Sequence, residues 1–431
     1  MSGLARLCLE KGLEVSGSDL RMTDTTRELI GKGVQFFEGH AYENIDDTVE
    51  CVVYTSAAGA DNPERRAAVD KGIPLISRAD YLMRQVNDKD VIAVAGSHGK
   101  TTTTSMIAEV LRVYEGENAS YYIGGILQTS KTNAHRGKGR FMAVELDESD
   151  ASFLLCTRGT ALITTIDYEH VDFYETESAY NTAFASFINA FHGNVYIGGH
   201  AYSKVHSLLT REVQVVALDT ARQPDSFTYD SFTVNGKRIS LSVVGIHAVF
   251  DAWCAYCALH DVGIPHEIIA HGLATCRGAE RRMQELYNDG STVIVDDYGH
   301  HPSEIDVTFD ACENKYRGMK KIVLFQPHRY SRFNMFYTEF YTIFEKMDGI
   351  VVVLPVYGAA EASTGTHTAQ HLVEDLRKVR KDVVYCPTHD DALRFIGEHV
   401  QGHTAVIFFG AGDGNKVLYR LREQLRTDGM Q

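Results

Sequence analysis

The fold is decided by the stretch VIAVAGSHGKTT at residues 91–102, in which a run of valine, isoleucine and alanine enters a glycine-rich loop. Apolar residues then recur at helical spacing, in Met106, Ile107, Val110 and Leu111. A buried strand that turns through such a loop into a helix is typical of α/β domains with mainly parallel sheets. The loop amides and the helix N-terminus together form a site for phosphate.

The loop itself supplies the groups that a nucleoside triphosphate requires. Gly96 and Gly99 allow the backbone to approach phosphate, Lys100 adds a cation, and the Thr101 hydroxyl suits Mg²⁺. The spacing is shorter than the general G-x-x-x-x-G-K-[ST] pattern, so a glycine-rich turn with a chance Lys-Thr pair is the alternative. The position between strand and helix favours a phosphate loop formed by Gly96, Ser97, His98, Gly99, Lys100, Thr101 and Thr102.

Acidic residues follow two further predicted strands. Phe141–Glu145 leads into the segment Glu145–Asp150, and Ala161–Ile166 leads into Asp167–His170. Because ligands bind beyond the carboxyl ends of parallel strands, we expect these side chains beside the phosphate loop. Carboxylate oxygens are the ligands that Mg²⁺ prefers. Taken singly, the first segment is equally a solvated acidic turn and His170 a structural histidine, but the common sheet edge favours a metal–nucleotide site.

Strand-like runs alternate with helical patterns along the rest of the chain, which predicts further parallel sheets. These runs are Cys51–Tyr54, Val293–Val295, Ile322–Phe325, Ile350–Leu354 and Ala405–Phe409. Alternation around Asn235-Gly236 predicts a local antiparallel hairpin within Ser226–Val243. A charged linker at Arg84–Asp90 and a polar turn at Tyr287–Gly290 divide the chain. We therefore expect three domains, at residues 1–87, 88–283 and 284–431.

Composition narrows the class of protein. With 42 Lys+Arg and 57 Asp+Glu among 431 residues, the formal charge is −15, which argues against a general nucleic-acid binder. Apolar stretches fall short of the roughly 18–20 residues of a membrane helix, and the N-terminus lacks a signal-peptide pattern. The eight cysteines are scattered, and Cys254 and Cys257 lie in a helical pattern. We therefore expect a cytoplasmic protein with reduced thiols, without membrane insertion or a nucleic-acid partner.

Four motifs in a fixed order resemble the Mur ligase family. They are GSHGKTTT at 96–103, ELDESD at 145–150, DDYGHHP at 296–302 and FQPHRYSR at 325–332. The resemblance implies a Rossmann-like N-terminal unit for a UDP substrate and a central P-loop ATPase domain with a parallel sheet and a small antiparallel element. It also implies a C-terminal Rossmann-like unit that admits an amino acid.

The same resemblance implies the reaction. ATP would phosphorylate the lactyl carboxylate of UDP-N-acetylmuramate, and the amine of L-alanine would attack the acyl phosphate to form an amide, a step of peptidoglycan precursor synthesis. ATP and Mg²⁺ are the implied cofactors, and the protein would act as a monomer or a homodimer. A carboxylate is a poor electrophile until its oxygen becomes a good leaving group, so catalysis would consist mostly of positioning and charge neutralisation.

Individual roles also follow from the resemblance. Lys100 would hold the ATP phosphates, while magnesium would be served by Thr101, Glu145 and His170. The γ-phosphate or the acyl phosphate would be approached by Arg281 and Arg282, and the nucleotide would also be contacted by His247 and Asp297. The pocket for L-alanine and the acyl end of the sugar substrate would be formed by His300, His328, Arg329 and Arg332. By charge alone, the two arginines beside His328 form either an anion site or a surface ion-pair cluster.

The chain departs from the family pattern in three places. In the family, a strand and a glycine loop precede the stretch that corresponds to Met1-Ser2-Gly3, with which this sequence starts. We therefore expect an N-terminal unit that lacks its first strand, and a true reading frame that begins upstream. The remaining candidates for the UDP side are Ser18, Asp19 and Ser56. Ala248 lies in Gly245–Asp251, where the family has Gly-x-His-Asn-x-x-Asn, and it offers adenine neither a donor nor an acceptor. Near the site, Thr165, Tyr168 and Glu280 stand where Asn, Pro and Gly are usual.

Three other interpretations remain open at this point. The first is the related ligase that attaches recycled tripeptide to UDP-N-acetylmuramate, which needs a wider pocket on the amine side. The second is a catalytically impaired relative that only binds, suggested by the missing N-terminal loop and Ala248. The third is a generic P-loop NTPase, in which the C-terminal motifs would have no role.

Overall fold

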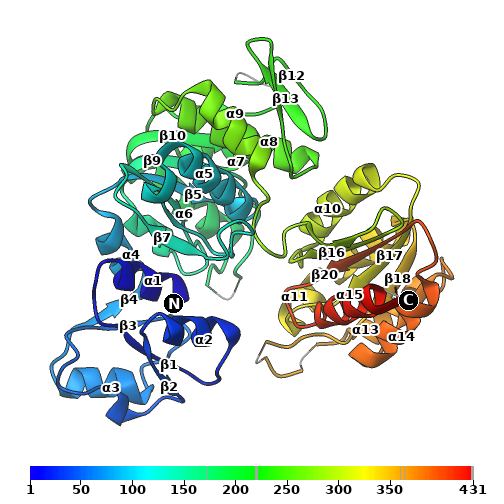
Figure 1. Ribbon diagram of the computed structural model, residues 1–431, viewed down its shortest axis with the longest axis horizontal. Helices are drawn as coiled ribbons and strands as arrows, with labels where there is room; N and C mark the ends of the chain where they lie inside the picture. Colours follow the sequence, from blue (N-terminus) through cyan, green and yellow to red (C-terminus); the bar gives the residue numbers. More distant parts are fainter. Residues whose placement is uncertain (172, 219–221, 360, 364, 429–431) are drawn as a thin grey trace. The chain divides into compact units, whose positions relative to one another are not determined.

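The computed structural model describes residues 1–428 except 172, 219–221, 360 and 364. The chain forms two compact units: the first contains Met1–Ser242 and Ala248–Arg277, and the second contains Val243–His247 and Gly278–Gln431 (Figure 1). Within the described part of the chain, no helix is both long enough and apolar enough to span a membrane.

A seven-stranded sheet in the order β11-β10-β9-β5-β8-β6-β7 forms the centre of the first unit. Neighbouring strands run parallel except for the antiparallel pair β6–β7. The strand bounds are β5 Asp90–Ala95, β6 Ser120–Tyr122, β7 Ala134–Arg136, β8 Phe141–Glu145, β9 Arg158–Ile163, β10 His192–Gly198 and β11 Gln214–Val216. Val91–Ala95 of β5 and Phe141–Val144 of β8 are apolar and buried on both faces, as expected for strands in the middle of a parallel sheet.

Helices and a small antiparallel sheet complete this part of the first unit. Their bounds are α5 Lys100–Glu115, α6 Glu177–Ala190, α7 Gly199–Val205, α8 Ile246–Asp261 and α9 His266–Thr275, with 3₁₀ turns η2 Gly116–Asn118, η3 Ser152–Leu155 and η4 His206–Leu208. The antiparallel sheet contains β12 Ser226–Phe227, β13 Ser231–Val234 and β14 Lys237–Ser240, which confirms the hairpin predicted at Asn235-Gly236.

The N-terminal part contains two separate parallel strand pairs. β1 pairs with β2, and β3 pairs with β4, so the expected Rossmann-like sheet is divided into two. The bounds are α1 Ser2–Glu10, β1 Ser16–Asp19, α2 Asp24–Gly31, β2 Gln35–Glu38, η1 Tyr42–Asn44, β3 Val52–Tyr54, α3 Pro63–Asp70, β4 Leu75–Ser77 and α4 Arg78–Val86. Leu4 and Leu7 of α1 and Leu82 and Val86 of α4 belong to the same buried cluster as the β5 and β8 side chains.

The second unit is built on a six-stranded sheet in the order β15-β16-β20-β17-β18-β19, parallel except for the antiparallel β15. Its strands are β15 Gln284–Asn288, β16 Thr292–Asp297, β17 Lys320–Phe325, β18 Ile350–Val353, β19 Val383–Tyr385 and β20 Thr404–Phe409. Its helices are α10 Pro302–Lys315, α11 Tyr330–Met335, α12 Tyr337–Lys346, α13 Ala369–Leu376, α14 His389–His399 and α15 Lys416–Asp428. Separate apolar clusters cover the two sheet faces, as in a doubly wound fold.

The α/β class with mostly parallel sheets is therefore confirmed, and two local predictions need correction. Arg84–Val86 belong to α4 instead of a linker, because Leu82 and Val86 are buried. Asp296 and Asp297 continue β16 instead of following its end, because the strand keeps pairing with β20 up to Phe409.

Candidate functional site

The loop between β5 and α5 has the backbone conformation that its glycines allow. Gly96 has φ +138° and Gly99 has φ +81° at the N-cap of α5. A Cβ atom at position 96 would lie 2.3 Å from the Thr164 hydroxyl, so only glycine fits against the loop that follows β9. The amides at the start of α5 are thereby kept at the carboxyl end of the sheet, and a helix N-terminus in this position suits an anion.

Hydrogen bonds tie this loop to the end of β9. The Ser97 amide donates to the Thr165 carbonyl at 3.0 Å, and the His98 amide donates to the Thr165 hydroxyl at 2.9 Å. The Ser97 hydroxyl donates to the Asp167 carbonyl at 2.9 Å, contacts the Tyr180 hydroxyl and accepts from the Asp167 amide at 2.7 Å. Ser97 therefore fixes the shape of the loop through its amide and hydroxyl, and Thr165 is an anchor for it.

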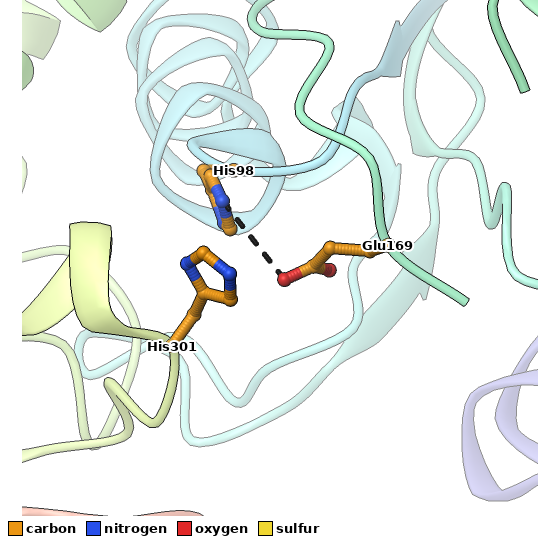
Figure 2. Close-up of side chains that lie close together, drawn as sticks. All are labelled: His98, Glu169 and His301. Carbon is orange, nitrogen blue, oxygen red and sulfur yellow. Dashed lines mark ion pairs between the residues drawn. The ribbon is translucent and has the colours of Figure 1, made fainter. Parts of the chain in front are cut away.

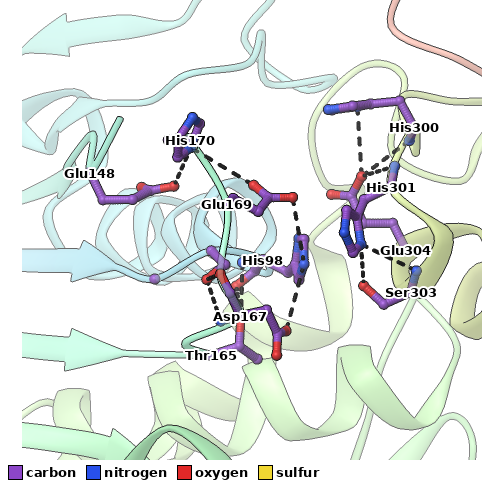
Figure 3. A network of polar contacts seen from close by, with 12 residues as sticks. His98, Glu148, Thr165, Asp167, Glu169, His170, His300, His301, Ser303 and Glu304 are labelled. Carbon is purple, nitrogen blue, oxygen red and sulfur yellow. Dashed lines mark hydrogen bonds and ion pairs between the residues drawn. The ribbon is translucent and has the colours of Figure 1, made fainter. Parts of the chain in front are cut away.

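Lys100 makes a buried ion pair that the sequence did not predict. Its Nζ lies 2.9 Å from Oε1 and 2.8 Å from Oε2 of Glu148, which is only 1% exposed. The same ammonium donates to the Gly96 and Ser97 carbonyls, and Glu148 Oε1 lies 3.1 Å from Nε2 of His170. Figure 3 shows Glu148 and His170 within this network. Residues from the ends of β5, β8 and β9 thus form one chain of polar contacts.

Carboxylates set the charge of this region. Burial disfavours the ammonium of Lys100, yet Glu148, and then Glu145 and Glu169, raise its pKa above the usual 10.5. Glu145 accepts hydrogen bonds from the Thr101 hydroxyl at 3.0 Å and from the Gly124 amide at 2.8 Å. Lys100 is therefore a permanent cation surrounded by acids.

Two donor sets at this sheet edge suit a divalent cation. Thr101 and Glu145 offer hard oxygen ligands, which fit Mg²⁺. Glu148, Glu169 and His170 each offer a ligand atom, and these atoms lie within 4.8 Å of one another. His170 has φ +56°, an uncommon value for a residue other than glycine, of the kind that often marks functional positions. The prediction from the sequence missed Glu148 and Glu169, although both lie in the acidic segments that it identified.

His98 faces acids from the loop after β9. Its Nε2 lies 3.6 Å from Asp167 Oδ2 and 3.9 Å from Glu169 Oε1, the second of which is drawn in Figure 2. A protonated imidazole would be stabilised by both carboxylates. His98 therefore adds a group that can be charged to the same edge of the sheet.

In the second unit, Arg281 and Arg282 both lie near the Tyr298 ring, with guanidinium carbons 4.9 and 5.4 Å from its centroid. Arg281, at φ +59°, donates to the Gly410 carbonyl at 2.5 Å, and its Nε lies 3.5 Å from the buried Asp296. Arg282 lies 3.5 Å from Glu304. The Arg281 guanidinium thus contacts the loop after β20.

His300, His328 and Arg332 lie together in this unit. The ring centroids of His300 and His328 are 5.6 Å apart, and Arg332 Nη1 is 3.4 Å from His328 Nδ1. Burial, and then Arg332 and Arg329, lower the pKa of His328 to about 4. Burial lowers the pKa of His300 to about 3 despite the nearby Glu304. Both imidazoles are therefore neutral at pH 7, and the cationic charge belongs to the arginines.

Of the residues predicted to bind nucleotide, Asp297 is buried and His247 is half-buried in the second unit. Asp297 accepts from the Met283 amide at 2.8 Å and the Gly299 amide at 2.7 Å, and burial raises its pKa to about 6. His247 has a buried Nδ1 without a hydrogen-bond partner in the described structure, and burial lowers its pKa to about 4. Asp297 thus acts first as an organiser of the turn after β16.

A further polar cluster surrounds Ser18 at the end of β1. Its hydroxyl lies 2.9 Å from His40 Nδ1 and donates to Glu64 Oε2 at 2.6 Å, while Asn44 donates to the other Glu64 oxygen at 2.7 Å. Asp19 and Ser56 are exposed. Of this cluster, the sequence analysis named Ser18 alone. His40 follows the end of β2, so the expectation that ligand-binding side chains follow the carboxyl ends of parallel strands would also have identified it.

The Lys100–Glu148 pair predicts a coupling in stability. Lys100→Met should lower the free energy of unfolding by about 3 kcal/mol, because it leaves a buried carboxylate without its cation. Adding Glu148→Gln should recover most of that loss, and a double-mutant cycle in urea should show a coupling of at least about 1 kcal/mol. Strictly additive single and double variants would contradict a stabilising pair.

The histidine pKa values predict different titrations in one sample. The ring signals of His300 and His328 should stay unchanged from pH 8 to about pH 5.5, since their folded-state pKa values lie lower. His135 is the internal control, because its hydrogen bond with Glu10 raises its pKa above 6.5. NMR of labelled histidine rings measures all three. A midpoint near 6.5 for His328 would contradict its burial among arginines.

Comparisons with known proteins agree with these motifs. Family models match as follows: Mur ligase family, catalytic domain at residues 1–89; Mur ligase middle domain at 94–259; Mur ligase, glutamate ligase domain at 281–412. The chain is 35% identical to a UDP-N-acetylmuramate–L-alanine ligase of a Sulfurihydrogenibium species over 96% of this chain and 92% of that one. It is also 35% identical to the enzyme of that name from Aquifex aeolicus, over 96% and 93%. A solved UDP-N-acetylmuramate-alanine ligase from Thermotoga maritima superposes with a TM-score of 0.85 at 25% identity, covering 99% and 97% of the two chains. The chain therefore belongs to the Mur ligase family.

Proposed function

We propose that this protein joins L-alanine to UDP-N-acetylmuramate, the ligation for which its relatives are named. In this proposal the new amide forms at the lactyl carboxylate, and ATP is converted to ADP and phosphate. One observation carries the proposal: Lys100, Glu148 and His170 come from the ends of three adjacent parallel strands and meet at a phosphate loop. A generic phosphate loop would give no role to the half-buried histidines and the neighbouring arginines of the second unit.

The chemistry explains why such a site needs both cations and bound ATP. A carboxylate resists attack by an amine until one of its oxygens becomes a good leaving group. Transfer of the γ-phosphoryl group makes an acyl phosphate, the L-alanine nitrogen then bonds to the acyl carbon, and the C–O bond breaks to release phosphate. In the transition state of this transfer, negative charge is spread over the phosphoryl oxygens. Fixed positive groups that stabilise this charge therefore accelerate the transfer.

In this proposal, the first unit binds the triphosphate. Lys100 leaves the Glu148 carboxylate and holds a phosphate oxygen, while the amides at the start of α5 hold the others. Thr101, Glu145 and His170 would hold magnesium, which neutralises phosphate charge. Glu148 and Glu169 keep His170 in place, and the released Glu148 adds negative charge near the metal-binding groups.

The second unit supplies the acceptor side. Arg282 is better placed than Arg281 to meet a phosphoryl group, because the Arg281 guanidinium already contacts the Gly410 carbonyl. Arg329 and Arg332 would bind the carboxylate of L-alanine or the acyl phosphate. The neutral imidazoles of His300 and His328 would accept or donate single hydrogen bonds there. His247 and Asp297 would contact the nucleotide, and Ser18, Asp19 and Ser56 the UDP group.

Phosphate release tests this proposal. Purified protein should release phosphate only when ATP, Mg²⁺, UDP-N-acetylmuramate and L-alanine are all present. Lys100→Ala should lower kcat at least about a thousandfold, because a charge-neutralising group is lost from the transition state. The exposed Lys138→Ala is the matched control and should keep wild-type turnover.

The outcome also separates the alternatives. Faster turnover with the stem tripeptide than with L-alanine would identify the recycling ligase. Binding of ATP and UDP-N-acetylmuramate without phosphate release would identify an impaired binding protein. Phosphate release that does not require L-alanine would contradict ligation.

A further inference from the structure

The phosphate loop also has a buried contact with α6. The Tyr180 side chain is 0% exposed, and its hydroxyl lies 3.1 Å from the hydroxyl oxygen of Ser97, which is itself only 7% exposed. A buried tyrosine hydroxyl needs a hydrogen-bond partner, because folding removes the water that it would otherwise contact. The proposed reaction assigns no role to Tyr180, although its partner lies within the loop that would hold phosphate.

The other contacts of Ser97 fix the direction of this hydrogen bond. The Ser97 hydroxyl donates its one proton to the Asp167 carbonyl at 2.9 Å, and its oxygen accepts from the Asp167 amide at 2.7 Å. A hydroxyl oxygen has two lone pairs, so the second lone pair accepts from Tyr180. Burial raises the pKa of Tyr180 above the usual 10, so this donor keeps its proton. The Tyr180 hydroxyl thereby completes the hydrogen bonding of Ser97.

Aromatic packing holds the Tyr180 ring independently of its hydroxyl. The ring makes edge-to-face contacts with Tyr174, Phe184 and Tyr168, at centroid distances of 4.9, 5.2 and 6.0 Å. Aromatic pairs favour this arrangement. Tyr174 is anchored in turn by its own hydroxyl, which donates to the Glu148 carbonyl at 2.7 Å. Phenylalanine at position 180 would therefore keep the ring contacts and lose the hydrogen bond to Ser97.

The way in which Ser97 holds the loop gives this hydrogen bond a consequence for anion binding. The Ser97 amide donates to the Thr165 carbonyl and its hydroxyl contacts Asp167, so the loop after β5 is tied to the segment after β9. A loop that is already ordered binds its ligand more tightly, because binding then costs less conformational entropy. Loss of one buried hydrogen bond changes an equilibrium constant by about three- to tenfold.

We propose that Tyr180 is a positioning residue, which holds the phosphate loop in its nucleotide-binding shape through the hydrogen bond to Ser97. The inference rests on the proposed function, since it requires that nucleotide binds at this loop. The Tyr180 hydroxyl serves the affinity for nucleotide, whereas the affinity for L-alanine does not depend on it.

Calorimetric titration of ADP in excess MgCl₂ tests this role. Tyr180→Phe should raise the Kd for ADP by about fivefold, because the loop loses one of its buried hydrogen bonds. In phosphate-release assays, the same variant should raise the KM for ATP by a similar factor and leave the KM for L-alanine unchanged. A general loss of stability would not separate the two KM values in this way.

A double variant tests whether Tyr180 acts through Ser97. Ser97→Ala should weaken ADP binding at least as much as Tyr180→Phe, because it removes every hydrogen bond of the Ser97 hydroxyl. In the Ser97→Ala background, Tyr180→Phe should change the Kd by less than about twofold, since its partner is already gone. Fully additive losses in the double variant would contradict this route.

The matched control is Tyr196→Phe in β10. Tyr196 is also buried in the first unit, but its hydroxyl donates to Asp261 at 2.6 Å, so its loss should lower thermal stability and leave the Kd for ADP unchanged. An unchanged Kd in Tyr180→Phe, or equal weakening in both tyrosine variants, would overturn the inference and leave the proposed function intact.

The two proposals can also fail separately in the other direction. If wild-type protein binds ADP but releases no phosphate with L-alanine, the proposed ligation fails, and the ADP titrations still decide the role of Tyr180. Wild-type protein that binds no ADP would overturn both proposals.

Discussion

A lysine ammonium held between a buried glutamate and two backbone carbonyls is the interaction on which the site depends. Lys100 and Glu148 lie 48 positions apart in the sequence, and their contact joins the carboxyl ends of β5 and β8. Neither charge is tolerable alone in that environment, since an unpaired buried ion costs several kcal/mol. The pair therefore keeps the loop closed around its own cation.

Negative charge surrounds that cation on several sides. Glu145 and Glu169 raise the pKa of Lys100 together with Glu148. In the proposed function, a nucleotide must compete with the protein's own carboxylates for the loop. Magnesium would resolve this competition, because it can bind the displaced acids and reduce the charge of the phosphates at the same time. The proposed function therefore predicts strong dependence on the metal.

The sequence predicted the location of the candidate site better than the contacts between its side chains. β8 has the predicted bounds, and the strand-end rule located Lys100, Glu145 and His170 at one edge, because buried strands and glycine loops leave local patterns. No local sequence pattern marks three other contacts, because each depends on tertiary packing. These are the Lys100–Glu148 pair, the hydrogen bond from the Ser97 hydroxyl to Asp167, and the approach of Asp251 to Gly99. The divided N-terminal sheet shows the same limit. Each strand pair joins strands that are neighbours in the sequence, but the separation of the two pairs depends on tertiary packing.

The most direct measurement of the central claim is a crystal structure of the protein with ADP and Mg²⁺. The account predicts that Lys100 Nζ has left Glu148 and lies within hydrogen-bond distance of a phosphate oxygen, with the loop amides of residues 99–101 on the same phosphate group. Nucleotide bound elsewhere, or bound here with the Lys100–Glu148 contact unchanged, would contradict it.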